Sequence, residues 1–508
     1  MNAPGSRRRA AAAGVAATVL GVGLGELTAA LVAPQASPFT AVGSSLIDIA
    51  PPVAKDVAIA LFGTGDKAAL LTGIAVVLLA VAALAGVLQL RRPPGGVVVA
   101  LGFGTLGIVL AANRPDAVAL AWLPSAVAGG ASALALATLV REVSSPAAPA
   151  GEGYDRRRFL TLASAAGVVG IVGVVGGSLL RASRGAVTVV RSALRLPEPA
   201  VVADPVPAAA DLQITGLSPV VTPTDDFYRI DTALVVPQVD AATWRLRIHG
   251  LVEREVEISI DDLLALPLEE SFTTLMCVSN SVGGDLIGNA KWLGHPVRNL
   301  LEQAGPTAEA DMVLSTSADG FTASTPLEAL TDDRNAILAV GMNGEPLTPE
   351  HGYPVRMVVP GLYGYVSATK WVVDLEVTRF DRAQGYWTPR GWAARAPIKV
   401  QSRIDVPARG STVSAGEAVI AGVAWHQHVG ISAVEVQVDD GPWREATLAR
   451  AISADTWVQW SLAWDARPGR HTMRCRATNT DGETQTQYPA PPAPDGATGW
   501  HEIEVSVS

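Results

Sequence analysis

The chain has 508 residues, 49% of them hydrophobic, and a formal net charge of −10 at pH 7. This length allows more than one domain, and the averages mix two different halves. Long apolar stretches fill the first part of the chain, whereas acidic residues concentrate beyond position 200, which argues against nucleic acid as a partner. The two cysteines, Cys277 and Cys475, provide no disulfide framework.

Five apolar stretches predict a membrane domain over residues 1–182, because each approaches the ~20 residues that cross a bilayer. They are Ala10 to Ala33, Ala68 to Leu90, Gly95 to Ala112, Ala117 to Val140 and Phe159 to Leu180. The flanking arginines, at positions 7–9, 91–92 and 141 with 156–158, fall at the amino terminus and in alternate loops, all of them on the cytoplasmic side if the chain starts there. We therefore expect a multi-pass protein in contact with membrane lipid, with everything after the fifth span on the extracytoplasmic side.

Two further features of this half bear on function. Glu26 lies within the first span, where an ionisable group is costly and becomes a functional candidate. We favour a neighbouring helix or the interface as its partner over a role in transport. In the loop of residues 34–66, the apolar piece Val57 to Phe62 is too short to span, and we expect it to lie on the outer surface.

The run Asp155-Arg156-Arg157-Arg158-Phe159-Leu160 precedes the last span and resembles a twin-arginine export signal at an internal position. Ordinary positive-inside anchoring would require the arginines but not the Phe-Leu pair. We favour the export interpretation. Because twin-arginine export carries folded proteins, it suits a domain that takes up a large cofactor before it crosses the membrane.

Beyond the membrane half, the pattern predicts a linker and two folded domains. The Pro- and Ala-rich segment 183–213 should be an extended linker. Residues 214–394 mix alternating strand-like runs with short helical pieces, an α+β signature without a GxGxxG or P-loop motif. Residues 395–508 carry short strands separated by turn signals, which favours an immunoglobulin-like β-sandwich.

The four expected strands of the sandwich are Ala418 to Ala424, Ile431 to Val438, Val458 to Trp464 and His471 to Ala477. Cys475 alternates with arginines on the last of them, so we expect it to be a buried apolar residue. Cys277 differs, because it lies where a partly β-branched run meets a polar, Gly-rich loop. A cysteine presented outward at a strand end can be an inert core residue, a nucleophile or a soft metal ligand.

Four sequence blocks occur in the order found in the sulfite oxidase family of molybdopterin enzymes, and they cover about Val221 to Val505. They are Phe227-Tyr228-Arg229 with Trp244-Arg245-Leu246; Cys277-Val278-Ser279-Asn280 with Trp292-Leu293-Gly294; Met342 to Leu347 with His351 to Gly361 and Lys370-Trp371; and Gly422 to Trp425 with Ile431 to Val436. Each block alone is common, but the four in order resemble the family strongly. The expected architecture is therefore an α-helical transmembrane bundle, an α+β sulfite-oxidase-like molybdopterin domain and an immunoglobulin-like, dimerisation-type domain.

The resemblance implies a molybdenum centre with two-electron oxygen-atom chemistry on a small molecule. Cys277 would bind molybdenum, and Arg229 would point toward the metal's oxygen ligands and an anionic substrate. Arg356 suits a bidentate grip on the cofactor phosphate, to which Lys370 adds a point charge. The full set implied to hold the pyranopterin is Tyr228, Asn280, His351, Arg356, Thr369 and Lys370.

The chain also departs from the pattern of sulfite oxidases proper. Ile230-Asp231 replaces Asn-His, Ser281-Val282 replaces two arginines, and no tyrosine follows Lys370-Trp371 at the matching spacing. These changes reduce the positive charge expected for binding sulfite and add an acid near it. Oxidation of a sulfite-like anion and reduction of a sulfoxide both stay open, and the departures favour substrates other than sulfite.

The electron partner is not set by the sequence. We expect neither haem nor an iron–sulfur cluster in this chain, because it has no CxxCH motif or cysteine cluster and its first histidine is His249. A quinone or a separate redox protein is therefore the expected partner. Two other readings are a non-catalytic binding protein built on a former molybdopterin domain, and a transporter with a sensor domain. The first predicts decay of Cys277, Arg356 or Lys370, all of which are present; the second rests on Glu26 alone.

Overall fold

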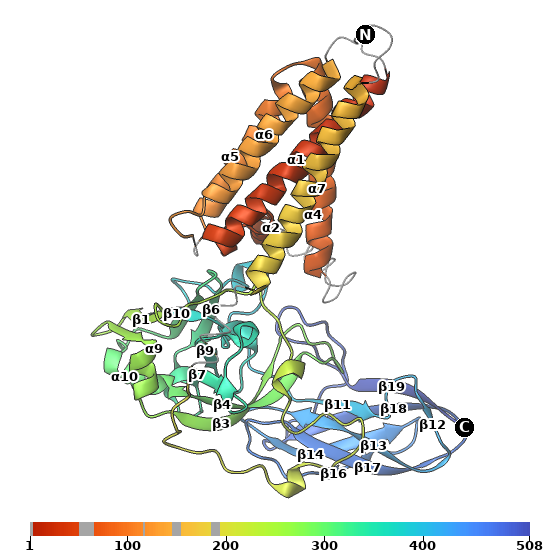
Figure 1. Ribbon diagram of the computed structural model, residues 1–508. Coiled ribbons are helices and arrows are strands. Elements are labelled where there is room, and N and C mark those ends of the chain that lie inside the picture. Colours follow the sequence, from red (N-terminus) through yellow and green to blue (C-terminus); the bar gives the residue numbers. More distant parts are fainter. Residues whose placement is uncertain (1–3, 50–65, 115–116, 145–153, 184–190, 192–193) are drawn as a thin grey trace. The chain divides into compact units, whose positions relative to one another are not determined.

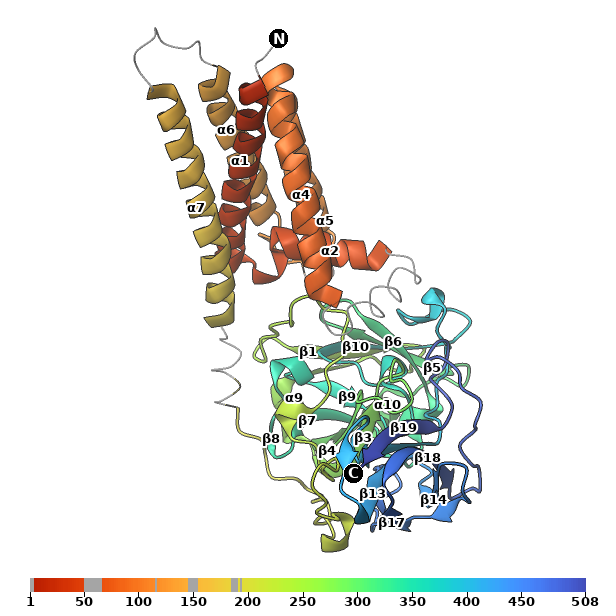
Figure 2. The same cartoon turned by 90° about the vertical axis from the view of Figure 1, so that its right-hand side faces the viewer.

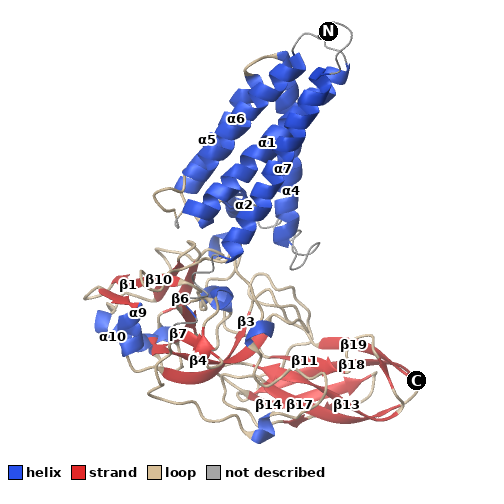
Figure 3. Ribbon diagram, in the orientation of Figure 1, coloured by secondary structure: helices blue, strands red, loops and turns tan. Residues whose placement is uncertain are grey.

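The computed structural model describes residues 4–49, 66–114, 117–144, 154–183, 191 and 194–508 (Figure 1). Two compact units account for the chain. The first comprises Met1–Ala186 with Ala233–Pro237, and the second comprises Val187–Thr232 with Gln238–Ser508. Figure 3 shows the contrast between them, since the first unit is built from helices and the second mostly from strands.

The helices of the first unit run alongside one another in Figure 2, apart from the short α2. They are α1 (Pro4–Val32), α2 (Pro38–Ile49), α4 (Asp66–Arg91), α5 (Gly95–Ala112), α6 (Leu123–Ser144) and α7 (Tyr154–Ser183). Among the described residues, five helices are long and apolar enough to cross a membrane, in agreement with the five predicted spans.

Two details differ from the sequence prediction, and one prediction is not tested. The fourth apolar helix begins at Leu123 rather than at Ala117, since Pro124 is favoured in the first turn of a helix and turns precede it. Helix α2 was not predicted. The apolar piece Val57 to Phe62 lies outside the described residues.

Glycines let the helices of this unit approach closely. A Cβ atom added at Gly23 of α1 would lie 2.1 Å from the carbonyl oxygen of Gly170 in α7. Similarly, Gly104 of α5 faces Gly129 of α6. Small residues at such crossings allow helix backbones to pack together in an apolar solvent, where van der Waals contact replaces the hydrophobic effect.

Glu26 has a structural partner, as the favoured interpretation predicted. Its buried carboxylate forms an ion pair with Arg181 of α7, with 2.8 Å between Oε2 and Nη2. The hydroxyl of Ser37 donates a hydrogen bond of 2.8 Å to Oε1. The charge of this buried acid is therefore compensated by a neighbouring helix.

The linker expected over residues 183–213 is extended where it is described, but it is bound to the fold rather than free of it. The amide of Ala200 donates a hydrogen bond of 2.7 Å to the carbonyl of Leu268. Val201 pairs with Glu269 in an isolated parallel bridge. The segment therefore lines the start of the strand that leads to Cys277.

Two sheets and three short helices form the region 214–394, in agreement with the α+β prediction. One sheet has the order β2-β1-β10-β5-β6, with bounds Val256–Ser259, Arg245–Gly250, Val372–Thr378, Met312–Ser317 and Thr322–Pro326. The other has the order β3-β4-β7-β8, with bounds Glu269–Met276, Ile287–Pro296, Ile337–Met342 and Glu345–Pro346, and β9 (Arg356–Val358) pairs with β7. The helices are α9 (Ile260–Ala265), α10 (Val297–Ala304) and α11 (Glu328–Thr331). These elements share one hydrophobic core.

Two further sheets form the carboxy-terminal β region, residues 395–508. The first is β11-β13-β17-β16, with bounds Gln401–Val406, Gly416–Trp425, Val458–Ala466 and Thr447–Leu448. The second is β12-β19-β18-β14-β15, with bounds Thr412–Val413, His501–Val507, Gly469–Asn479, Ile431–Val438 and Arg444–Glu445. All four predicted strands are present, and Cys475 is buried in the shared core as expected. Assignment to the immunoglobulin class stays a prediction.

The carboxy-terminal β region binds the free edge of β3. The amide of Thr274 donates to the carbonyl of Asp455 at 3.0 Å, and the amide of Trp457 donates to the hydroxyl of Thr274 at 2.9 Å. The indole of Trp425 donates to the sulfur of Met276 at 3.2 Å. An unpaired strand edge exposes backbone hydrogen-bonding groups, and here the amide of Thr274 is paired with Asp455 and its carbonyl accepts from Gln427 at 3.2 Å. The strand that carries the site cysteine is thus held from both sides (Figure 1).

Two neighbouring threonines test this edge. Thr274→Val removes a hydroxyl that accepts from Trp457 and donates to Asn289 Oδ1 at 3.1 Å. Both partners would lose that hydrogen bond, so we expect a loss of about 1–3 kcal/mol in unfolding free energy. The measurement is thermal and denaturant unfolding of the full chain in detergent, followed by tryptophan fluorescence.

Thr273→Val is the matched control, because Thr273 is equally buried but its hydroxyl has no hydrogen-bond partner among the described residues. This variant should unfold within about 0.5 kcal/mol of the wild type, or be more stable. Equal losses for the two variants would show that the contact with Trp457 does not stabilise the edge.

Candidate active site

Cys277 lies directly after β3, where the strand gives way to a turn. Its amide donates to the carbonyl of Leu286 at 2.9 Å, and the amide of Ser279 approaches its sulfur at 3.4 Å. The strand-end position agrees with the prediction, but the side chain is buried rather than presented to solvent. Burial raises the pKa of the Cys277 thiol, while the Ser279 N–H opposes that shift. A cation bound at the sulfur would reverse the balance and favour the thiolate.

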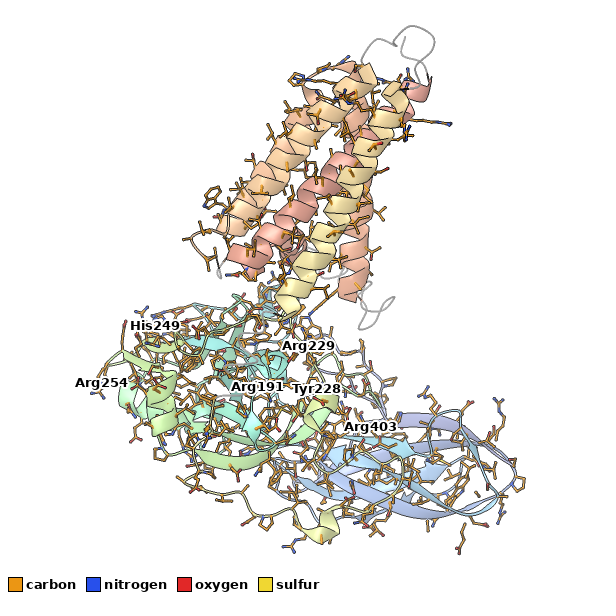
Figure 4. All side chains as sticks on the ribbon, viewed as in Figure 1. Arg191, Tyr228, Arg229, His249, Arg254 and Arg403 are labelled. Atoms are coloured by element: carbon orange, nitrogen blue, oxygen red, sulfur yellow. The ribbon has the colours of Figure 1, made fainter. Side chains whose placement is uncertain are left out.

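Tyr228 lies near enough to both Cys277 and Arg356 to interact with them electrostatically. Its ring stacks on Phe227, with 5.2 Å between centroids. Burial and the nearby Cys277 raise the pKa of its phenol, whereas Arg356 lowers it, so Tyr228 stays protonated at neutral pH and can donate a hydrogen bond. Figure 4 shows Tyr228 and Arg229 close together in the second unit.

Arg356, on β9, is a buried guanidinium whose partners in the described part of the chain are not acidic. Its side chain is only 5% exposed. It donates to the carbonyls of His351 at 3.3 Å and Ala368 at 3.4 Å, and it lies 5.0 Å from the ring centroid of Trp292. Burial lowers its pKa to about 10. Buried charges are normally paired, and these long hydrogen bonds to carbonyls leave the guanidinium suited to bind an anion.

Two other polar residues neighbour Cys277 and Arg356: the amide of Asn280 donates to the carbonyl of Cys277, and the carbonyl of His351 accepts from Arg356. Asn280 accepts from the amide of Leu286 at 2.9 Å, while its buried Nδ2 donor has no partner among the described residues. His351 Nε2 lies 3.0 Å from the carbonyl of Thr224, which requires a proton on that nitrogen. Burial, with help from Arg356, lowers the pKa of His351 to about 4, so its ring is neutral at pH 7.

Lys370 and Arg229 share one carboxylate. Lys370 Nζ lies 2.7 Å from Asp231 Oδ2, and Arg229 Nε lies 3.0 Å from the same oxygen. The side chains of Asp231 and Lys370 are 4% and 9% exposed, whereas that of Arg229 is 39% exposed. Burial lowers the pKa of Lys370 to about 8, and Asp231 opposes this shift. Lys370 also donates to the carbonyl of Glu350 at 3.0 Å.

Thr369 differs from Asn280, because its side chain already has a hydrogen-bond partner. Its hydroxyl lies 2.7 Å from the hydroxyl of Ser315, and its carbonyl accepts from the amide of Met357 at 2.9 Å. Both contacts tie the segment before Lys370 to the sheets. The side chain therefore already has a hydrogen-bond partner in this structure.

Two residues that sequence reasoning missed support the loop after Cys277. Arg403, on β11, donates to the carbonyl of Gly284 at 2.5 Å (Figure 4). The ring of His501 packs against Gly283, where an added Cβ would lie 2.2 Å from it and where φ is +77°. Glycine alone tolerates both the close contact and this backbone angle. No local motif marks Arg403 or His501, because they reach the loop from far along the chain.

Comparisons with known proteins agree with this geometry. Residues 233–387 match the family model described as the oxidoreductase molybdopterin binding domain. Over 172 residues, the chain is 34% identical to the uncharacterized oxidoreductase YuiH of Bacillus subtilis (strain 168), covering 34% of this chain and 83% of that protein.

Two other matches cover more of this chain but a smaller share of the matched protein. Mitochondrial sulfite oxidase of Homo sapiens is 29% identical over 340 residues, which cover 57% of this chain and 62% of that protein. The chain thus spans less than two thirds of the length of the human relative. The crystal structure of the sulfane dehydrogenase SoxCD from Paracoccus pantotrophus matches with 25% identity and a TM-score of 0.47, covering 53% of this chain and 75% of that one.

Fold and site together define a molybdopterin-binding oxidoreductase. The chain belongs to the sulfite oxidase family of molybdopterin-dependent oxidoreductases, as its four ordered sequence blocks predicted. The residues present fit the cofactor, because Arg356 is a buried cation without an acidic partner among the described residues and Asn280 holds a buried donor with none.

His501 gives the loop after Cys277 a testable pH dependence. Its Nδ1 accepts from the amide of Ile404 at 3.0 Å, and burial lowers its pKa from 6.5 to about 4. Between these pH values the unfolded chain binds more protons than the folded one, so stability is lost as pH falls, by up to about 1.4 kcal/mol per pH unit. His501→Asn keeps an acceptor and should flatten the pH dependence of unfolding in this window.

His471→Asn is a control of opposite sign. The hydrogen bond with Asp439 raises the pKa of His471, so its contribution is present at low pH and lost as pH rises through the folded pKa. Replacing it should steepen the acid-induced loss that His501→Asn reduces. If His501→Asn leaves the pH profile unchanged, the buried neutral ring is not the acid-sensitive group.

Proposed function

We propose that the chain is a membrane-anchored molybdopterin oxidoreductase that catalyses two-electron oxygen-atom transfer on a small molecule, with sulfur compounds as the candidates. The observation that carries this proposal is the buried guanidinium of Arg356, close to Tyr228 and without an acidic partner in the described part of the chain. A cofactor phosphate would supply the missing anion. Molybdenum bound by the pyranopterin supplies the oxygen-atom and electron chemistry.

The protein's own groups would divide into anion-binding and metal-binding residues. Arg356 is placed to grip the phosphate, and His351, neutral at pH 7, is a hydrogen-bonding neighbour rather than a third cation. Asn280 Nδ2 and the protonated phenol of Tyr228 are further donors for polar edges of the cofactor. Thr369 would act through the backbone, since its hydroxyl already contacts Ser315.

Cys277 would be the protein ligand of the metal. Because burial favours the protonated thiol, loading of the metal and loss of the thiol proton should occur together. Arg229 would orient an oxygen of the substrate, because part of its guanidinium stays exposed while Asp231 holds Nε in place. Lys370 would add positive charge on the cofactor side, and the Asp231 carboxylate would partly neutralise that charge.

The location and partners belong to the same proposal. Five long apolar helices and the alternating arginine clusters support a multi-pass membrane anchor with the catalytic part on the extracytoplasmic side. The proposed domains are residues 1–182, 214–394 and 395–508, and residues 183–213 link the first to the second. Electrons would pass to or from a separate redox protein or a quinone, and the carboxy-terminal β region would serve a homodimer.

Molybdenum analysis tests the cofactor. Wild-type chain purified from a host that makes molybdopterin should contain close to one molybdenum per chain, whereas metal-free protein from such a host would contradict the proposed function. In Cys277→Ser the anion-binding residues are intact, so we expect cofactor to remain while the thiolate-to-metal absorption bands are lost.

The control variant is Cys475→Ala, which changes the other buried cysteine, far from the cluster in sequence and on β18. Its absorption spectrum should match that of the wild type. A normal spectrum in Cys277→Ser would rule out the cysteine as the metal ligand.

Export is tested with Arg156→Lys and Arg157→Lys together. This change keeps the positive charge that orients a span but alters the twin-arginine pair. We expect the soluble part to become inaccessible to protease added outside spheroplasts. An otherwise matched double change of Arg91→Lys and Arg92→Lys should have no effect. Continued exposure of the soluble part in the first variant would favour ordinary anchoring.

A further inference from the structure

The position of Asp231 suggests how this site treats the charge of its substrate. The carboxylate contacts Lys370, expected on the cofactor side, and Arg229, expected on the substrate side, through one oxygen at 2.7 and 3.0 Å. Counting formal charges, this triad carries +1 rather than +2. Because the Asp231 side chain is 4% exposed, solvent screens these contacts only weakly.

Beyond Arg356, whose charge also acts on Lys370, the sequence segments expected to line the substrate side bring no further positive charge. The residue between Arg229 and Asp231 is Ile230, whose side chain is exposed. In the loop after Cys277, Ser281 and Val282 are uncharged. A substrate that meets Arg229 therefore also meets a fixed carboxylate and an apolar side chain.

We infer that Asp231 is a specificity-determining residue that selects neutral oxygen-atom donors or acceptors over divalent oxoanions. This inference rests on the proposed function. A dianion approaching Arg229 would be attracted by two cations but repelled by the nearby carboxylate, and it would compete with that carboxylate for Arg229 Nε. A neutral polar S=O or N–O group can accept a hydrogen bond from the exposed part of Arg229 without this repulsion.

Sulfoxide reduction consumes electrons and protons, whereas sulfite oxidation releases them. Reducing a neutral sulfoxide breaks one S–O bond and consumes two electrons and two protons, releasing a thioether and water. A reduced viologen dye supplies the electrons in an assay. Oxidising sulfite adds an oxygen that derives from water, forms sulfate and releases two protons and two electrons to an acceptor.

The test compares sulfate binding and turnover in Asp231→Asn and wild type, both with measured molybdenum content. Asparagine keeps an oxygen that can accept from Lys370 and Arg229, so the local contacts can persist. Removing one negative charge a few ångströms from the anion should tighten sulfate binding about tenfold, measured by calorimetry, and lower KM for sulfite by a similar factor. kcat/KM for dimethyl sulfoxide should change by a smaller factor than kcat/KM for sulfite.

Asp225→Asn is the matched control, because it removes the same charge from an exposed side chain six positions earlier. It should alter sulfate affinity less than twofold. Unchanged sulfate affinity in a molybdenum-loaded Asp231→Asn would overturn the inference and leave the proposed function standing, whereas metal-free wild type would overturn the proposed function itself.

A second measurement, on the wild type and Asp231→Glu, serves if Asp231→Asn does not fold. Its kcat/KM for the neutral sulfoxide should exceed that for sulfite at least tenfold, and Asp231→Glu, which keeps the charge, should preserve this order. A preference for sulfite in either protein would contradict the role of Asp231.

Discussion

The edge of β3 is the constraint on which the site depends. A strand that ends at Met276 delivers Cys277 to a buried position, and its outer edge would otherwise present unpaired backbone groups. Residues from the carboxy-terminal β region complete that edge through Thr274, and Trp425 caps the Met276 sulfur. The same region supports the following loop through Arg403 and His501. The cysteine is therefore positioned by two parts of the chain that are far apart in sequence.

Burial then sets the protonation of the groups around this cysteine. It keeps the Cys277 thiol and the Tyr228 phenol protonated and keeps His351 neutral. Arg356 retains its charge at such depth, because even a pKa of about 10 lies well above neutral pH. One strong, uncompensated cation is a specific anchor for a phosphate, and neutral donors around it can read the rest of a cofactor without adding to the cost of burying charge.

The charges of Lys370 and Arg229, unlike that of Arg356, are compensated by an acidic side chain. Asp231 pairs with both of them, although the sequence pattern alone would count the two cations as free. A relative with neutral residues at that position would present a more positive site on the same fold. Under the proposed function, the net charge near Arg229 can therefore change without altering Arg356 and its carbonyl partners.

The sequence by itself determined the helical membrane-like half, the short strands of the carboxy-terminal β region and the family, since these depend on local apolar patterns and on ordered motifs. It identified Cys277, Arg356, Lys370 and the unusual Asp231. Only the tertiary structure decided that Cys277 is buried and that Asp231 joins Lys370 to Arg229, because these are contacts between residues distant along the chain. The support from Arg403 and His501 likewise required the fold. Periodicity reports which face of an element is buried, but it carries no information on which distant side chain completes a charge pair or a strand edge.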